Sequence, residues 1–161
     1  MSVLVMRHGL SEANNRENYG TPVFGNPEAS LMLEGRQQAI ALGGKLATEF
    51  SIELAVVPVA VSMMRRTQET AIVAGFRKLS IYPELNEEKG DMSDADTVIA
   101  LKTRCPPEAT KIAARYLIKH PPQEKLWITH ALLIATICQE LEVYENERFT
   151  PRFCEVRELP L

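Results

Sequence analysis

The stretch "VLVMRHGLSEAN", residues 3–14, places two chemically active side chains directly after an apolar run. The run itself is typical of a buried strand, and Arg7, His8 and Gly9 follow it. A guanidinium fork suits the oxygens of a phosphoryl group, and a neutral imidazole beside it can attack phosphorus. A glycine here lets the backbone turn close to a phosphate. These residues therefore indicate phosphoryl chemistry.

Two more predicted strands end in side chains of the same kind. The strand at 54–62 runs into Arg65 and Arg66, and the strand at 125–130 ends in His130. Ligands of open α/β sheets bind beyond the carboxyl ends of the strands, so we expect these side chains to converge there. They would form a small cationic pocket whose guanidinium groups stabilise charge on the transferring oxygens. Arg65 is expected to be a solvated charge at a helix start rather than part of that pocket.

A carboxylic acid close to this pocket could protonate the leaving oxygen. The stretch "PELNEE" follows a short predicted strand and supplies Glu84, Glu87 and Glu88. The residue types alone do not decide among the three. His120, at the end of a predicted helix, is interpreted as a cation near the helix terminus with no chemical role.

The elements that must position these residues alternate between strands and helices. Hydrophobic periodicity and turn signals predict strands at 2–7, 54–62, 79–85, 125–130 and 152–159. They predict helices at 31–50, 65–76, 94–104, 107–119 and 131–142. This alternation favours an α/β fold, a three-layer α/β/α sandwich with a mostly parallel central sheet. We expect one domain over residues 1–161, since the chain contains no linker or repeat.

Composition excludes several other classes of protein. A net charge of −3 gives no basic field for nucleic acid or an anionic membrane, and no apolar segment is long enough to span a bilayer. The three cysteines are widely spaced, which argues against a disulfide framework and suits a reducing cytoplasm. Three histidines, two of them already given roles, leave little for a divalent metal, so we expect neither a metal nor a cofactor.

Five segments in order resemble the signatures of the histidine phosphatase superfamily, the phosphoglycerate mutase-like group. They are "VMRHGLSEAN", "SLMLEGRQQAIALG", "SMMRRTQETA", "LNEEKG" and "WITHA", which together span nearly the whole chain. The resemblance implies that His8 becomes phosphorylated and that water then hydrolyses the phosphohistidine. It implies catalytic roles for His8, Glu87 and His130, and phosphate binding by Arg7, Arg66, His130, Asn14 and Ser11.

Three positions depart from the family pattern, and none carries a catalytic group. Leu10, Met32 and Ala131 replace the usual acidic residue, threonine and glycine. The short chain resembles the open-site phosphatases of the family, including those that act on phosphohistidine proteins. We therefore expect a small phosphorylated metabolite or a phosphohistidine protein as substrate, with oligomeric state left open. The alternatives are a non-catalytic phosphate-binding module and a mutase-type phosphotransferase.

The neighbouring residues exclude two competing phosphatase motifs. The stretch "DADTVI" at 94–99 has the spacing of an aspartate nucleophile motif, but the polar "EEKGDMS" precedes it where an apolar strand is required. We interpret it as a helix start with Asp94 near the N-cap. The stretch "CPPEATK" places Lys111 where a cysteine-dependent phosphatase needs arginine, so Cys105 is not a nucleophile of that kind.

Overall fold

A five-stranded sheet in the order β3-β2-β4-β1-β5 forms the centre of the computed structural model, which describes residues 2–87 and 92–161. The strands are β1 (Val3–Arg7), β2 (Val59–Val61), β3 (Leu79–Ile81), β4 (Leu126–Thr129) and β5 (Val156–Leu159). The sheet is parallel except for β5, which pairs antiparallel with β1. The prediction of a mostly parallel sheet is therefore confirmed, and the antiparallel edge strand was not foreseen.

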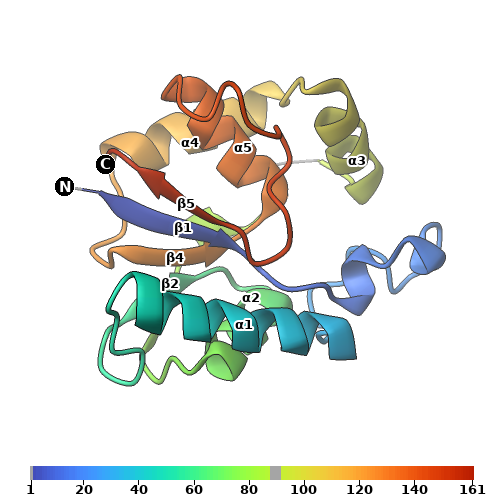
Figure 1. Ribbon diagram of the computed structural model, residues 1–161. Coiled ribbons are helices and arrows are strands. Elements are labelled where there is room, and N and C mark those ends of the chain that lie inside the picture. Colours follow the sequence, from blue (N-terminus) through green and yellow to red (C-terminus); the bar gives the residue numbers. More distant parts are fainter. Residues whose placement is uncertain (1, 88–91) are drawn as a thin grey trace.

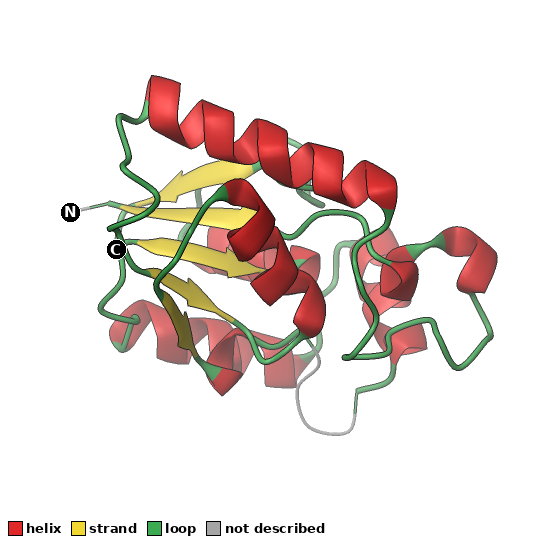
Figure 2. Cartoon of the chain, turned by 90° about the horizontal axis from the view of Figure 1, so that it is seen from below, coloured by secondary structure: helices red, strands yellow, loops and turns green. Residues whose placement is uncertain are grey.

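Helices cover both faces of the sheet (Figures 1 and 2). They are α1 (Leu33–Glu49), α2 (Arg65–Ala74), α3 (Asp94–Thr103), α4 (Glu108–Lys119) and α5 (Ala131–Glu140). Helices α1 and α2 pack together on one face, and α4 and α5 pack together on the other. A separate core lies under each pair, with Leu42 and Ala71 in one and Leu117 and Ile137 in the other. This is the predicted three-layer α/β/α sandwich.

The register of the two central strands brings their ends side by side. Arg7, the last residue of β1, pairs with Thr129, the last residue of β4. The amide of His8 then donates to the carbonyl of Thr129 at 3.1 Å, which extends the ladder by one more residue. Because both strands run in the same direction, His8 and His130 leave the sheet together at its carboxyl edge.

Four predicted boundaries are wrong, each for a local reason. The predicted strand at 79–85 is reduced to β3, because Pro83 has no amide for a ladder and Pro83–Leu85 form a 3-10 helix. The predicted strand at 54–62 is reduced to β2, because residues 54–57 form turns and Pro58 has no amide for a ladder. The predicted strand at 152–159 is reduced to β5, because residues 151–155 turn back over the end of β1. The helix predicted from Leu31 begins at Leu33, because Leu31 pairs with Ser11 in an isolated bridge.

The start of α3 confirms that "DADTVI" is a helix start. Ser93 is the N-cap, its hydroxyl accepts from the amide of Asp96, and the Asp96 carboxylate accepts from the Ser93 amide. Asp94 is the first residue of the helix. Both aspartates therefore serve the helix N-terminus, where negative charge is stabilising.

Gly9 and Gly35 explain how α1 approaches the end of β1. A Cβ on Gly9 would lie 2.6 Å from the carbonyl oxygen of Gly35, and a Cβ on Gly35 would lie 1.9 Å from that of Leu10. Gly9 is not among the described residues with positive φ. The glycine after His8 is therefore required by the close approach of α1, whereas the sequence suggested a turn around phosphate.

We expect Gly35→Ala to destabilise the fold by about 2–3 kcal/mol, because the added methyl must push α1 away from the backbone that follows His8. Gly44→Ala, on the same helix, meets no atom within 4 Å and is expected to stabilise by about 0.5–1 kcal/mol. Chemical denaturation of the two variants checks this contrast. Equal effects would show that the Gly35 contact does not constrain α1.

Cys105, Cys138 and Cys154 are all free cysteines. Within the two described ranges, no helix has the length and apolar character needed to cross a membrane.

Candidate active site

His8 has the burial and hydrogen bonding of a nucleophile. It lies just beyond β1, with 2% of the residue exposed. Its Nδ1 lies 2.7 Å from the carbonyl oxygen of Gly9, which only accepts, so Nδ1 carries the proton and Nε2 keeps a lone pair. Burial first, and then the charges of Arg66 and Arg7, hold the pKa of His8 well below its ordinary value. The imidazole is therefore neutral at pH 7.

Gly9 also connects His8 to α2. Its amide donates to the hydroxyl of Thr70 at 3.0 Å, and that hydroxyl donates to the carbonyl of Arg66 at 2.7 Å. The backbone after the nucleophile and the first turn of the arginine-bearing helix are thus joined through one side chain.

The two arginines next to His8 come from different elements. Arg66 lies in the first turn of α2 and is 2% exposed. Arg7 ends β1, and its Nη1 donates to the carbonyl of Pro151 at 2.8 Å. Burial is the main cause that lowers the pKa of Arg7 to about 10, so this guanidinium still carries its charge at pH 7. Two cations beside a neutral imidazole suit an anionic group.

His130 is held by a chain of hydroxyl groups. It is fully buried at the N-cap of α5, and its ring centroid lies 5.1 Å from that of His8. Its Nε2 lies 2.8 Å from the hydroxyl of Ser62, which lies 2.8 Å from the hydroxyl of Thr67. Because Ser62 follows β2 and Thr67 belongs to α2, these contacts fix the ring between two elements. Neither residue was predicted from the sequence, although Ser62 opens one of the segments that resemble the family.

Glu87 lies at the N-terminus of α5, the helix whose N-cap is His130. It is 5% exposed, and its carboxylate accepts from the amides of Leu132 and Leu133 at 3.1 and 3.0 Å. Burial raises the pKa of Glu87, while these two amides, and then Arg66 and Arg7, act in the opposite direction. Glu87 is thus a buried acid that holds its proton to higher pH than an ordinary glutamate, as a proton donor requires.

The other two candidate acids differ from Glu87 in position. Glu84 is exposed, in a short 3-10 helix at Pro83–Leu85, and Glu88 lies outside the described residues. Thr129 donates its hydroxyl to the carbonyl of Leu85 at 2.6 Å, which attaches this segment to the end of β4. Of the two candidate acids that the structure describes, Glu84 and Glu87, only Glu87 is buried.

Ser11 and Asn14 lie in the loop that follows Gly9. The Ser11 hydroxyl donates to the Asn14 side-chain oxygen at 2.7 Å, and Ser11 is fully buried. The hydroxyl proton of Ser11 is therefore engaged with Asn14, and a phosphate contact by either residue stays a prediction. Arg65 is exposed and pairs with Glu69, and His120 is exposed at the end of α4, as expected for both.

The loop at 15–29 and the start of α3 touch each other. A Cβ on Gly25, in the 15–29 loop, would collide with the carboxylate of Asp94 at the start of α3. Both segments lie on the side of the sheet where β1 ends (Figure 1).

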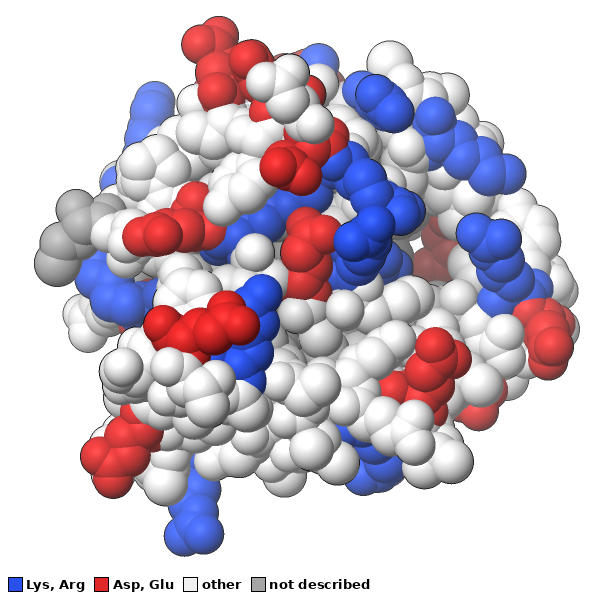
Figure 3. Space-filling view, in the orientation of Figure 1, with Lys and Arg blue, Asp and Glu red and all other residues white. Residues whose placement is uncertain are grey.

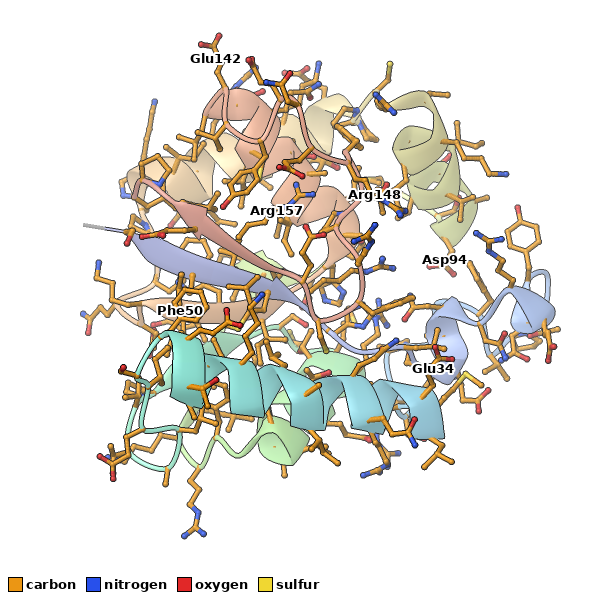
Figure 4. All side chains as sticks on the ribbon, in the orientation of Figure 1. Glu34, Phe50, Asp94, Glu142, Arg148 and Arg157 are labelled. Carbon is orange, nitrogen blue, oxygen red and sulfur yellow. The ribbon has the colours of Figure 1, made fainter. Side chains whose placement is uncertain are left out.

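Basic side chains gather on this face of the molecule. Figure 3 shows blue side chains to the right of centre, in the region where Figure 4 labels Arg148. This local charge contrasts with the net charge of −3 of the whole chain, and it favours anionic ligands.

The sequence matches the family model of the histidine phosphatase superfamily (branch 1) over residues 3–113. The chain belongs to this superfamily. The match covers the segments that carry Arg7, His8, Arg66 and Glu87, and it ends before His130. Histidine phosphatases are generally phosphatases or phosphotransferases, so membership supports activity of this general kind.

Solved structures show the same histidine phosphatase fold at low sequence identity. The protein TTHB049 of Thermus thermophilus is 21% identical with a TM-score of 0.67, over 99% of this chain and 94% of that one. The Rv3214 protein of Mycobacterium tuberculosis is 22% identical with a TM-score of 0.67, over 99% and 91%. Mycobacterial glucosyl-3-phosphoglycerate phosphatase Rv2419c, in complex with VO3, is 18% identical with a TM-score of 0.63, over 98% and 90%. No curated protein sequence matches the chain.

Proposed function

We propose that this protein is a phosphatase that hydrolyses a phosphomonoester or a phosphohistidine through a covalent phosphohistidine on His8. The observation that carries the proposal is the state of His8, which is buried, neutral, hydrogen-bonded through Nδ1 and flanked by the charges of Arg7 and Arg66. A lone pair on Nε2 next to two cations is suited to attack on an anionic phosphoryl group.

The proposed reaction has two displacements at phosphorus. In the first, Nε2 of His8 forms a bond to phosphorus while the bond to the leaving oxygen breaks and Glu87 gives that oxygen a proton. Arg7, Arg66 and His130 hold the phosphoryl oxygens, on which charge develops. In the second, water attacks the phosphohistidine, the bond between Nε2 and phosphorus breaks, and dihydrogen phosphate leaves with His8 neutral again. Glu87 then regains its proton from solvent.

Two observations bear on the class of substrate. Basic side chains around the site face favour an anionic substrate (Figure 3), and one structural relative is a glucosyl-3-phosphoglycerate phosphatase. A small phosphorylated metabolite and a phosphohistidine protein both fit. A panel of phosphometabolites measured beside a phosphohistidine peptide separates them.

The test of the proposal is to trap the intermediate. Wild-type protein mixed with p-nitrophenyl phosphate and quenched in alkali should carry an acid-labile phosphoryl group, which mass spectrometry assigns to the peptide that contains His8. Phosphate on another residue, or none together with turnover, would overturn the mechanism. Transfer of the phosphoryl group to an added alcohol in preference to water would favour a mutase-type phosphotransferase.

The same mechanism predicts activity without a divalent metal. Among the described residues, no group of three or more metal-ligating side chains is close enough to bind an ion, and the proposed steps use only side chains. We expect full p-nitrophenyl phosphate hydrolysis in excess EDTA, and competitive inhibition by vanadate and inorganic phosphate. Activity that is lost on chelation and restored by zinc or magnesium would contradict this prediction.

A further inference from the structure

Residues 151–155, here called the C-terminal clasp, hold the end of β1 from outside the segment that matches the family model. The carbonyl of Pro151 accepts from Arg7 Nη1 at 2.8 Å, and the Phe153 ring centroid lies 3.8 Å from Arg7 Cζ. The backbone contributes two more contacts, since the Cys154 amide donates to the Arg7 carbonyl at 2.9 Å and the Arg7 amide donates to the Glu155 carbonyl at 3.2 Å. Backbone and side chain of one arginine are thus both held.

Arg157 fixes the clasp to the rest of the fold. It lies on β5, is 2% exposed, and donates through Nε to the Glu155 carboxylate at 2.7 Å. Its Nη2 donates to the carbonyl of Arg148, and its Nη1 lies 3.7 Å from the sulfur of Cys138 on α5. The clasp is therefore attached at both ends and is a built feature rather than a loose loop. Figure 4 shows Arg148 and Arg157 in this part of the chain.

The contacts that the clasp makes with Arg7 leave this arginine able to bind an oxyanion. A carboxylate partner would neutralise Arg7, whereas an aromatic face attracts the cation and leaves its charge and its hydrogens available. Nε of Arg7 is buried and has no hydrogen-bond partner among residues 2–87 and 92–161. One edge of the guanidinium is fixed by a carbonyl, one face is fixed by a ring, and a donor remains for an oxyanion.

We propose that Phe153 is a positioning residue that holds the Arg7 guanidinium in the orientation in which it binds phosphoryl oxygens. The ring also borders the nucleophile, because its centroid lies 6.1 Å from that of His8. The proposal deepens the proposed function and rests on it for the role of Arg7 in turnover. The binding of a phosphate ion by Arg7 does not depend on turnover.

The experiment compares Phe153→Leu, which removes the ring face, with Phe153→Tyr, which retains it. Inorganic phosphate binding is measured by calorimetry, and kcat and KM are measured with p-nitrophenyl phosphate. Phe153→Leu should weaken phosphate binding and kcat/KM by roughly 5- to 30-fold each, the range that a desolvated cation–π contact corresponds to. Phe153→Tyr should restore most of both.

Phe50→Leu is the matched control. Phe50 is a partly buried phenylalanine at the C-cap of α1, and Figure 4 shows it at the other end of this helix from Glu34, which lies in the first turn. It should leave phosphate affinity unchanged. A lower kcat in Phe153→Leu with unaltered phosphate affinity would reduce Phe153 to a packing residue and overturn the proposal. If the wild-type protein lacks turnover but Phe153→Leu still weakens phosphate binding, the positioning role stands and the phosphatase proposal fails.

Discussion

Replacing His8 with alanine is expected to lower p-nitrophenyl phosphate turnover by about 10⁴-fold or more, because the proposed reaction has no other nucleophile to accept the phosphoryl group. His8 is almost fully buried, so the methyl side chain leaves a gap that could lower stability. His8→Asn separates the two effects. Its side-chain amide can still donate to the Gly9 carbonyl, but it cannot form the phosphorylated intermediate. Both variants should be equally inactive.

The matched control is His120→Ala, which removes an exposed histidine at the end of α4. It should leave turnover unchanged. Wild-type turnover no greater than that of His8→Ala would overturn the enzyme proposal and favour a non-catalytic phosphate-binding module on the same scaffold. Thermal unfolding of each variant shows whether a loss of activity is a loss of folded protein.

Replacing Glu87 with glutamine is expected to separate substrates by their leaving groups. Turnover of an alkyl phosphomonoester should fall by roughly 10²- to 10⁴-fold, because an alkoxide needs a proton in the transition state. Turnover of p-nitrophenyl phosphate should hardly change, since p-nitrophenolate leaves without one. Glutamine keeps an oxygen that can accept one of the two α5 amides bound by Glu87, but it has no acidic proton.

Glu84→Gln is the matched control, because Glu84 is exposed three residues before Glu87. Equal and small losses on both substrates in Glu87→Gln would remove Glu87 as the acid. The donor would then be Glu84 or Glu88, or there would be none. The last outcome would favour a phosphohistidine protein as substrate, because the imidazole of a phosphohistidine leaves easily.

Much of the fold could be predicted because the decisive signals are local. Each of the five strands and five helices was placed by an apolar run or a helical period close to its final position. The errors fall where distant contacts decide the local structure. Residues 152–155 were predicted as part of the last strand, but they turn back over Arg7, and the ladder begins at Val156.

The same distinction applies to the site, where residues marked by their own segment could be predicted and their distant partners could not. His8, Arg66 and His130 could be predicted because each follows a strand end and lies in a recognisable segment. The residues that orient them could not, because their partners lie far along the chain. Ser62 and His130 are 68 residues apart, and Pro151 and Arg7 are 144 residues apart. No spacing rule connects such pairs, and only the folded sheet brings them together.

The position of β1 has a consequence for the order in which the molecule folds. Its two neighbours, β4 and β5, are made from residues 126–129 and 156–159, so β1 has no strand to pair with until residues 126–129 have been made. By contrast, β2 and β3 can pair as soon as residues 59–81 emerge. Pairing over such separations is slow and leaves apolar strands exposed to other chains. A chain interrupted before residue 156 therefore carries Arg7 and His8 on an unfinished edge, prone to aggregation and without the environment that makes this histidine reactive.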